Sequence, residues 1–140
     1  MNNILCRFFA LMAISLAIAG CSMSADTSIA ESEVPRFHRQ LNAQELGAIY
    51  DNSASEMKEA TGRKEFIEFL QAVHRKLGVM KTTERQNWHV NYGTNGTVIT
   101  LVYNTSFTEG EATEQFLYRL EGKTAKLMGY NINSNAFILK

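Results

Sequence analysis

The stretch NYGTNGTVITLVYNTSF, residues 91–107, decides the fold of this chain. After the Asn-Gly pair at 95–96, Ile99, Leu101 and Tyr103 fall on one side of an extended chain. Such alternation is typical of a strand with one buried face, and Asn-Gly between alternating runs is a strong hairpin signal. The stretch therefore predicts a tight turn at 93–96 followed by a strand over 97–107.

Alternation continues on both sides of this hairpin. A strand before it begins near Met80, and turns at 108–111 and 121–123 separate two further strands after it. Three turns that join successive strands predict an antiparallel meander. The large side chains expected on alternating positions of these strands are Trp88, Val90, Tyr92, Phe116, Tyr118, Leu120, Met128, Tyr130 and Ile132.

Two amphipathic segments, 42–57 and 61–77, precede the strands and are expected to be helical, with a bend or break in the first near 51–53. Phe69 on the second segment is expected, together with Trp88, to lie at the centre of the core. Helices followed by hairpin-linked strands predict an α+β domain with the helices against one face of an antiparallel sheet. The apolar stripe of the second segment consists of Phe66, Phe69, Leu70, Val73 and Leu77.

The first twenty residues have the pattern of a targeting segment. An apolar run over 8–19 is shorter than the ~20 residues that a spanning helix needs, and it fits the apolar region of a secretory signal peptide. It ends in Ile18-Ala19-Gly20-Cys21, which resembles the lipobox of bacterial lipoproteins. The resemblance implies a diacylglyceryl group on Cys21, cleavage before it and acylation of the new amino terminus. The alternatives are an ordinary secretory signal with a chance cysteine, or an uncleaved anchor.

The residue after the cysteine bears on the destination of such a lipoprotein. Ser22 stands where an aspartate would resemble the signal that retains lipoproteins in the inner membrane. The resemblance therefore implies a lipid anchor in the outer membrane, facing the periplasm, with the inner membrane less favoured. It also implies attachment to the membrane through Cys21, and a binding or accessory role for such a lipoprotein would add a periplasmic protein partner.

The segment 22–36 is rich in Ser, Ala and Glu and poor in large apolar residues. Such a composition is typical of segments that do not bury enough surface to become ordered, so we expect a flexible tether. The expected organisation is a signal peptide at 1–20, a lipidated cysteine and tether at 21–36, and one domain at 37–140. A domain that starts at Phe37 is expected to fold without the tether.

Several short motifs accompany this order of elements. They are Phe66, Phe69, Arg75-Lys76-Leu77-Gly78, Arg85, Tyr103-Asn104-Thr105-Ser106-Phe107 and Gly129-Tyr130-Asn131-Ile132. Together they resemble the cone-shaped cystatin-like and nuclear transport factor 2-like folds, and among these the secreted bacterial domains of unknown function. The resemblance implies N-terminal helices packed on a curved antiparallel sheet, and such folds host enzymes, binding modules and assembly parts alike.

The charge balance and the polar residues argue against several function classes. Removal of Arg7 with the leader would leave one basic residue fewer than the 14 acidic ones, so no basic surface for nucleic acid is expected. His38, His74 and His89 are expected to be solvated or boundary side chains, and no His, Cys or Asp cluster has metal-ligand spacing. We therefore expect no metal site and no cofactor.

Relatives of this architecture that are enzymes place an Asp with a His or a Tyr inside the cone. In this chain Asp26 falls in the expected tether and Asp51 at the end of the first helix, so neither lies on a strand. The strand residues Glu114 and Glu121 do not sit beside a histidine in any recognisable pattern. The sequence therefore predicts no catalytic residues and a protein that is not an enzyme.

Four aromatic residues of the sheet, Trp88, Tyr103, Tyr118 and Tyr130, are candidates for binding. Aromatic residues suit the half-buried surface of a sheet, so the first interpretation is core packing, and the second is an open groove in which the rings contact a ligand or partner. The sequence thus favours a non-catalytic binding or accessory lipoprotein. A small-molecule or lipid binder that uses the cone is the alternative, and an enzyme ranks last.

Overall fold

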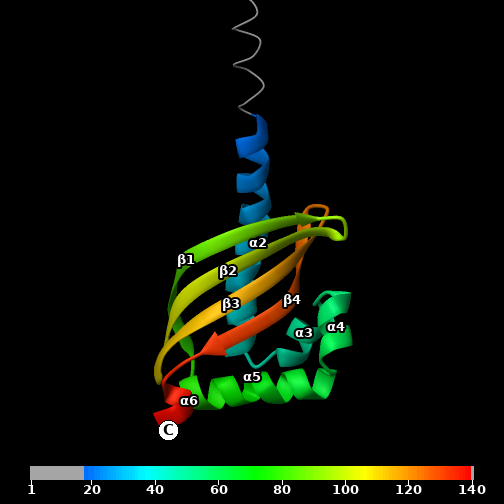
Figure 1. Cartoon of the computed structure of the whole chain (residues 1–140). Helices are drawn as coiled ribbons and strands as arrows, with labels where there is room; N and C mark the ends of the chain where they lie inside the picture. The colour runs from blue at the N-terminus through cyan, green and yellow to red at the C-terminus, as the bar shows by residue number, and fades with distance from the viewer. Residues whose placement is uncertain (1–17, 140) are drawn as a thin grey trace, which may run out of the picture.

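The structure, a computed structural model, describes residues 18–139. Residues 1–17, which hold most of the expected leader, and residue 140 lie outside the described residues. Four helices precede the strands in the described part and one short helix follows them (Figure 1). The elements are α2 (Ile18–Asn42), α3 (Leu46–Asp51), α4 (Ser55–Ala60), α5 (Arg63–Leu77), β1 (Met80–Gly93), β2 (Gly96–Phe107), β3 (Gly110–Glu121), β4 (Thr124–Asn133) and α6 (Ala136–Leu139).

The strands form one antiparallel sheet in the order β1-β2-β3-β4, so each strand pairs with its neighbour in sequence. Figure 1 shows that the sheet is curved, that α2 runs across one of its faces and that α5 lies at one end of the domain. The expected α+β class, with helices packed on a curved antiparallel sheet as in cystatin-like and nuclear transport factor 2-like folds, is confirmed. In the first hairpin Gly93 pairs with Gly96, which places Thr94 and Asn95 at the tip of the turn.

The segment 22–36 is helical, so the expectation of a flexible tether is wrong. It forms the middle of α2, where Ala30 and Val34 are buried together with Phe37 and Leu41. These four positions are spaced by four, three and four residues, which places them on one helix face toward the sheet. The composition was misleading because Ala30 and Val34 are small, whereas their spacing relative to Phe37 and Leu41 is what produces an apolar stripe.

Pro35 lies inside α2 and has no N–H to donate to the carbonyl of Glu31, a defect that costs about 3 kcal/mol in a helix interior. Packing of the buried stripe offsets this cost, because tertiary contacts supply most of the stability of a helix in a protein. Asn42, at the end of α2, accepts a hydrogen bond from the backbone N–H of Met80 (2.9 Å) and donates one to its carbonyl (3.1 Å). This pair of bonds joins the end of the helix to the start of β1.

The expected break near 51–53 is present, since α3 ends at Asp51 and α4 begins at Ser55. Two bonds from Arg63 to the Asp51 carboxylate, at 2.9 and 3.2 Å, join α3 to the start of α5. The hydrogen bond from Arg63 holds the pKa of Asp51 below its usual value. The second predicted helix is confirmed as α5, with Phe66, Leu70, Val73 and Leu77 buried.

Phe69 and Trp88 do not lie at the centre of the core, contrary to expectation. Their exposed fractions are 40% and 39%. Phe69 lies at the border of the buried face of α5 and meets Tyr130 edge-on. Trp88 lies on β1, an edge strand with a neighbour on one side only, so less of its ring is covered. The centre is instead occupied by Phe116 on β3, which is fully buried.

A β-bulge changes the buried face of β4. Met128 is an extra residue opposite Leu117 and Tyr118, so the buried face continues from Leu127 to Tyr130 across the bulge. Met128 is therefore only half-buried, and the simple alternation expected from Met128 onward is wrong in this part of the strand.

The packing of α2 can be tested by placing a charge on its buried face. We expect Val34→Asp to lower the free energy of unfolding by several kcal/mol, because it buries a carboxylate without a partner in a domain of marginal stability. Ser32→Asp, at an exposed position of the same helix, is the matched control and should leave stability nearly unchanged. Urea unfolding followed by circular dichroism measures both, and equal midpoints for the two variants would mean that 22–36 is a tether after all.

Candidate functional site

A carboxylate lies in the middle of the apolar interior. Glu114 is on β3 at a position that faces α2, between the buried residues Ala112 and Phe116, and it is fully buried itself. Burying an ionised carboxylate is costly unless hydrogen bonds replace its water. The groups around Glu114 are therefore the first candidates for a functional constellation.

Three donors surround the Glu114 carboxylate. His38 on α2 contacts Oε2 through Nε2 at 2.7 Å, and the Thr105 hydroxyl on β2 donates to the same oxygen at 2.5 Å. The Tyr130 hydroxyl on β4 donates to Oε1 at 2.6 Å. Thr83 on β1 lies 2.7 Å from Thr105, and because the Thr105 proton is directed at Glu114, Thr83 is the donor in this pair. The network therefore connects α2 with all four strands.

The protonation of His38 follows from its contacts. Nε2 faces the Glu114 carboxylate, whereas Nδ1 is buried and contacts no polar group of the described residues. A proton on Nε2 makes the ring a donor to Glu114, and a second proton on Nδ1 would be a buried donor without a partner. The ring with a single proton, on Nε2, is the form that fits these contacts.

The structure corrects two expectations about these residues. His38 lies within a helix and is fully buried, so it is neither solvated nor at a boundary. Glu114 does have a histidine partner, 76 residues away in sequence. The sequence did contain one signal for the burial of Glu114. Phe116 and Tyr118 lie two positions apart on the buried face of the strand, and Glu114, two positions before Phe116, falls on the same face.

The other polar candidates do not join this network. His74 is half-buried on α5, and His89 is exposed on β1. Asp26 accepts a hydrogen bond from Tyr92, and Glu121 pairs with Lys126 at 2.9 Å. Within residues 18–139, no three side chains of the His, Cys, Asp and Glu types are arranged so that they could hold a metal ion.

Three of the four aromatic binding candidates are core residues. Tyr103, Tyr118 and Tyr130 are exposed by 8% or less, and Tyr130 packs against Phe116 at 5.1 Å between ring centroids. Burial, reinforced by the charge of Glu114, raises the pKa of Tyr130 well above its usual value, and burial does the same to the pKa of Tyr118. Trp88 alone of the four offers a substantial part of its ring to solvent.

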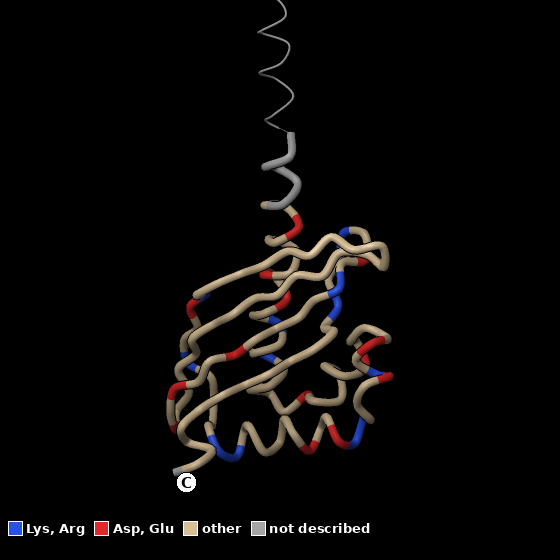
Figure 2. Tube along the Cα trace, viewed as in Figure 1, with Lys and Arg blue, Asp and Glu red and all other residues tan. Residues whose placement is uncertain are grey.

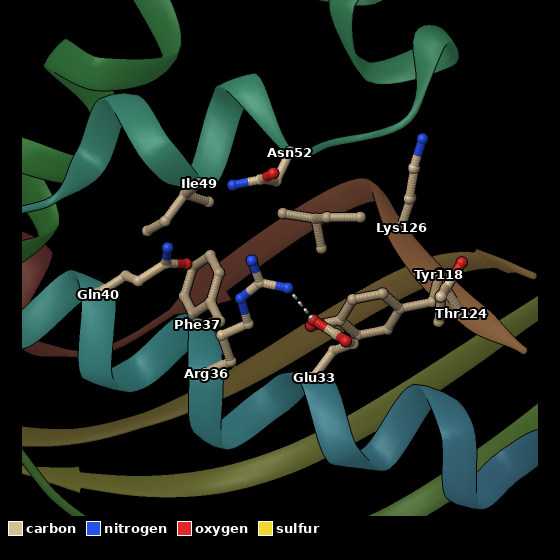
Figure 3. Close-up of a pocket in the computed structure, with 11 residues that line it drawn as sticks. Glu33, Arg36, Phe37, Gln40, Ile49, Asn52, Tyr118, Thr124 and Lys126 are labelled. Atoms are coloured by element: carbon tan, nitrogen blue, oxygen red, sulfur yellow. Dashed lines mark hydrogen bonds and ion pairs between the residues drawn. The ribbon is translucent and has the colours of Figure 1, made fainter.

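A shallow pocket of about 190 Å³ lies between α2, α3 and the hairpin of β3 and β4 (Figure 3). Its polar lining includes Glu33 and Arg36, which form an ion pair at 3.4 Å, and Gln40, while Phe37 and Tyr118 contribute ring surface. Three larger pockets on the described part of the chain, of about 380–430 Å³, are not lined by Glu114 or His38. Tyr130, whose hydroxyl belongs to the network, does line one of them, together with Phe66 and Phe69.

Cys21, the expected lipid attachment point, lies in the first turns of α2, and its side chain is outside the described residues. None of the described helices is both long enough and apolar enough to cross a membrane. No protein-family model matches the chain, and no curated protein matches it at a significant level.

The Glu114 network can be tested by removing its charge while its shape is kept. We expect Glu114→Gln to cost about 1–3 kcal/mol of stability, because the amide NH₂ would face at least one of the three donors and leave two buried donors opposed. Glu111→Gln, at an exposed position of the same strand, is the control and should cost less than about 0.5 kcal/mol. Similar urea midpoints for both variants would show that the buried charge is not required.

The raised tyrosine pKa values predict loss of stability in alkali. A tyrosine with a raised pKa in the folded state keeps its proton there, so its contribution is complete below the unfolded value of about 10 and is lost as the pH rises above it. We expect Tyr118 and Tyr130 each to add ~1.4 kcal/mol per pH unit to this decline. Urea unfolding at a series of pH values measures the slope, and Tyr118→Phe should reduce it. Ionisation of every tyrosine near pH 10 in the folded protein would contradict the prediction.

Proposed function

We propose that this protein is a bacterial lipoprotein, anchored in the outer membrane through an acylated Cys21, and that its periplasmic domain is a non-catalytic binding or accessory module. The observation that carries the anchor is the sequence Ile18-Ala19-Gly20-Cys21 at the end of a short apolar run. The peptidase of this pathway needs small residues beside the cut, and these residues supply them. Two or more acyl chains make such an anchor stable, whereas one binds a membrane only reversibly.

A non-catalytic role is supported by the filled interior. Phe37, Phe116 and Tyr130 pack against one another with ring centroids 4.7–5.1 Å apart, where a ligand-binding cone would need open space. The pocket beside α2 is small, about 190 Å³, and the ion pair of Glu33 with Arg36 forms part of its lining. These features favour recognition at the surface, by a periplasmic protein partner, over enclosure of a small molecule or lipid.

An enzyme remains the competing candidate because of one observation. Glu114 lies within hydrogen-bond distance of both His38 and Tyr130, which is a geometry that general acid–base catalysis uses. A catalytic group must also reach its substrate, and Glu114 and His38 are both fully buried. The arrangement therefore fits a structural network better than a reactive one.

The anchor is tested by comparing the two cysteines of the chain. We expect Cys21→Ala to abolish acylation and to leave the leader uncleaved, while Cys6→Ala, within the leader, keeps normal processing and membrane attachment. Intact mass spectrometry and sedimentation of membranes measure these outcomes. A Cys21→Ala protein that is still processed, acylated and bound to the membrane would overturn the proposal.

A further inference from the structure

The contacts of α2 determine which side of the domain lies nearest to Cys21. The Tyr92 hydroxyl on β1 donates to Asp26 at 3.2 Å, and Arg85 on the same strand forms an ion pair with Glu31. Figure 1 shows α2 projecting from the domain beyond β1, with α5 at the opposite end. The strand β1 therefore borders the part of α2 that leads toward its N-terminus.

The distance from Cys21 to this strand follows from helix geometry. Asp26 and Glu31 are five and ten residues from Cys21 within one continuous helix. At a rise of 1.5 Å per residue, these positions lie about 8 and 15 Å along the axis from the cysteine. A flexible segment of the same sequence would place no such limit on the distance or on the orientation.

The surface of β1 nearest to the emerging helix is aromatic, and its own side chains are uncharged. Residues 86–96 contain no Lys, Arg, Asp or Glu, and most of β1 is tan in Figure 2, with charged residues only near the start of the strand. Two charged side chains of other elements border it, because Asp26 accepts from Tyr92 and Arg119 donates to the carbonyl of Asn95 at 2.6 Å. Trp88 and Tyr92 are exposed by 39% and 53%, and Val90 is half-buried beside them. We call the surface formed by Trp88, Val90, Tyr92 and the turn 93–96 the β1 rim.

Trp and Tyr are the side chains enriched where membranes meet water, since each has an apolar ring and a polar group. We infer that the β1 rim rests in the headgroup region of the bilayer, an inference that depends on the proposed acylation of Cys21. The anchored helix brings the rim to the surface, and the two rings then stabilise one orientation of the domain. The opposite end, with α5, points into the periplasm and is left for a partner.

The chemistry of β1 also limits how deep the rim enters. As an edge strand, β1 has backbone groups on its outer side that no other strand of the described sheet pairs. Such groups are not tolerated in hydrocarbon, but water and headgroups satisfy them. The occupant of this surface is therefore the interfacial layer. The rim's own side chains are uncharged and the bordering Asp26 and Arg119 have opposite signs, so we expect the contact to depend only weakly on salt.

A second copy of the chain is a poorer occupant of the same edge. Two copies that paired β1 with β1 would be related by a two-fold axis, which directs their α2 N-termini past each other in opposite directions. The two acylated cysteines would then lie at opposite ends of the pair. One bilayer could not accept both anchors without breaking the helix.

Trp88 is the only tryptophan of the chain, so its fluorescence reports on the rim alone. The experiment uses the full lipidated protein in phosphatidylcholine vesicles with brominated acyl chains, which quench only fluorophores that contact the bilayer. We expect loss of most of the Trp88 emission, changed little by added salt, together with protection from the aqueous quencher acrylamide. The matched control is Trp88→Phe with Phe69→Trp, which moves the single tryptophan to the equally exposed position on α5 and should escape the lipid quencher.

The outcomes separate the two proposals. Intact mass of the same sample shows whether Cys21 is acylated, and an unacylated mature protein overturns the proposed function. An acylated protein in which Trp88 is quenched by acrylamide but not by brominated lipid overturns the membrane contact alone. Protection of Trp88 from both quenchers also overturns it, because a second copy of the chain would then cover the rim.

Discussion

The carboxylate of Glu114 is the constraint on which the interior depends. A buried carboxylate needs protein donors to replace the hydrogen bonds that water would make to it. Here the donors are His38, Thr105 and Tyr130, which lie on three different elements. His38 is the member of the network on α2, so its bond to Glu114 favours one placement of the helix against the sheet, whereas apolar contacts alone would tolerate several. Apolar packing supplies most of the stability, and we expect the buried carboxylate to favour one register of the helix on the sheet.

The placement of α2 in turn decides what the protein can present at its surface. A helix with Ala30 and Val34 buried against the sheet extends as a rigid element toward Cys21. The domain therefore has a defined near side and a defined far side relative to the proposed anchor. With a flexible segment in this place, the anchor would not determine which face of the domain lies nearest to the membrane.

Several elements could be predicted from local patterns because their signals are short in range. Three features depend only on residues that are close together in sequence. They are the turn at 93–96, the strand after it and the apolar stripe of α5. The errors have a common physical origin. Burial of Phe69 and Trp88 depends on whether another element covers them, and the bulge at Met128 depends on the partner strand, so neither is encoded in the spacing of the residues themselves.

The sequence by itself determined the class of the domain and the order of its strands, since periodicity and turn residues are local properties. It also supplies the motif Ile18-Ala19-Gly20-Cys21 on which the proposed anchor rests. Only the tertiary structure decided that His38 meets Glu114 and that Tyr118 and Tyr130 are core residues. It also decided that residues 22–36 are helical. The physical reason is that a weakly apolar segment becomes ordered only when a sheet is present to cover it, and a buried charge is tolerated only when distant donors converge on it.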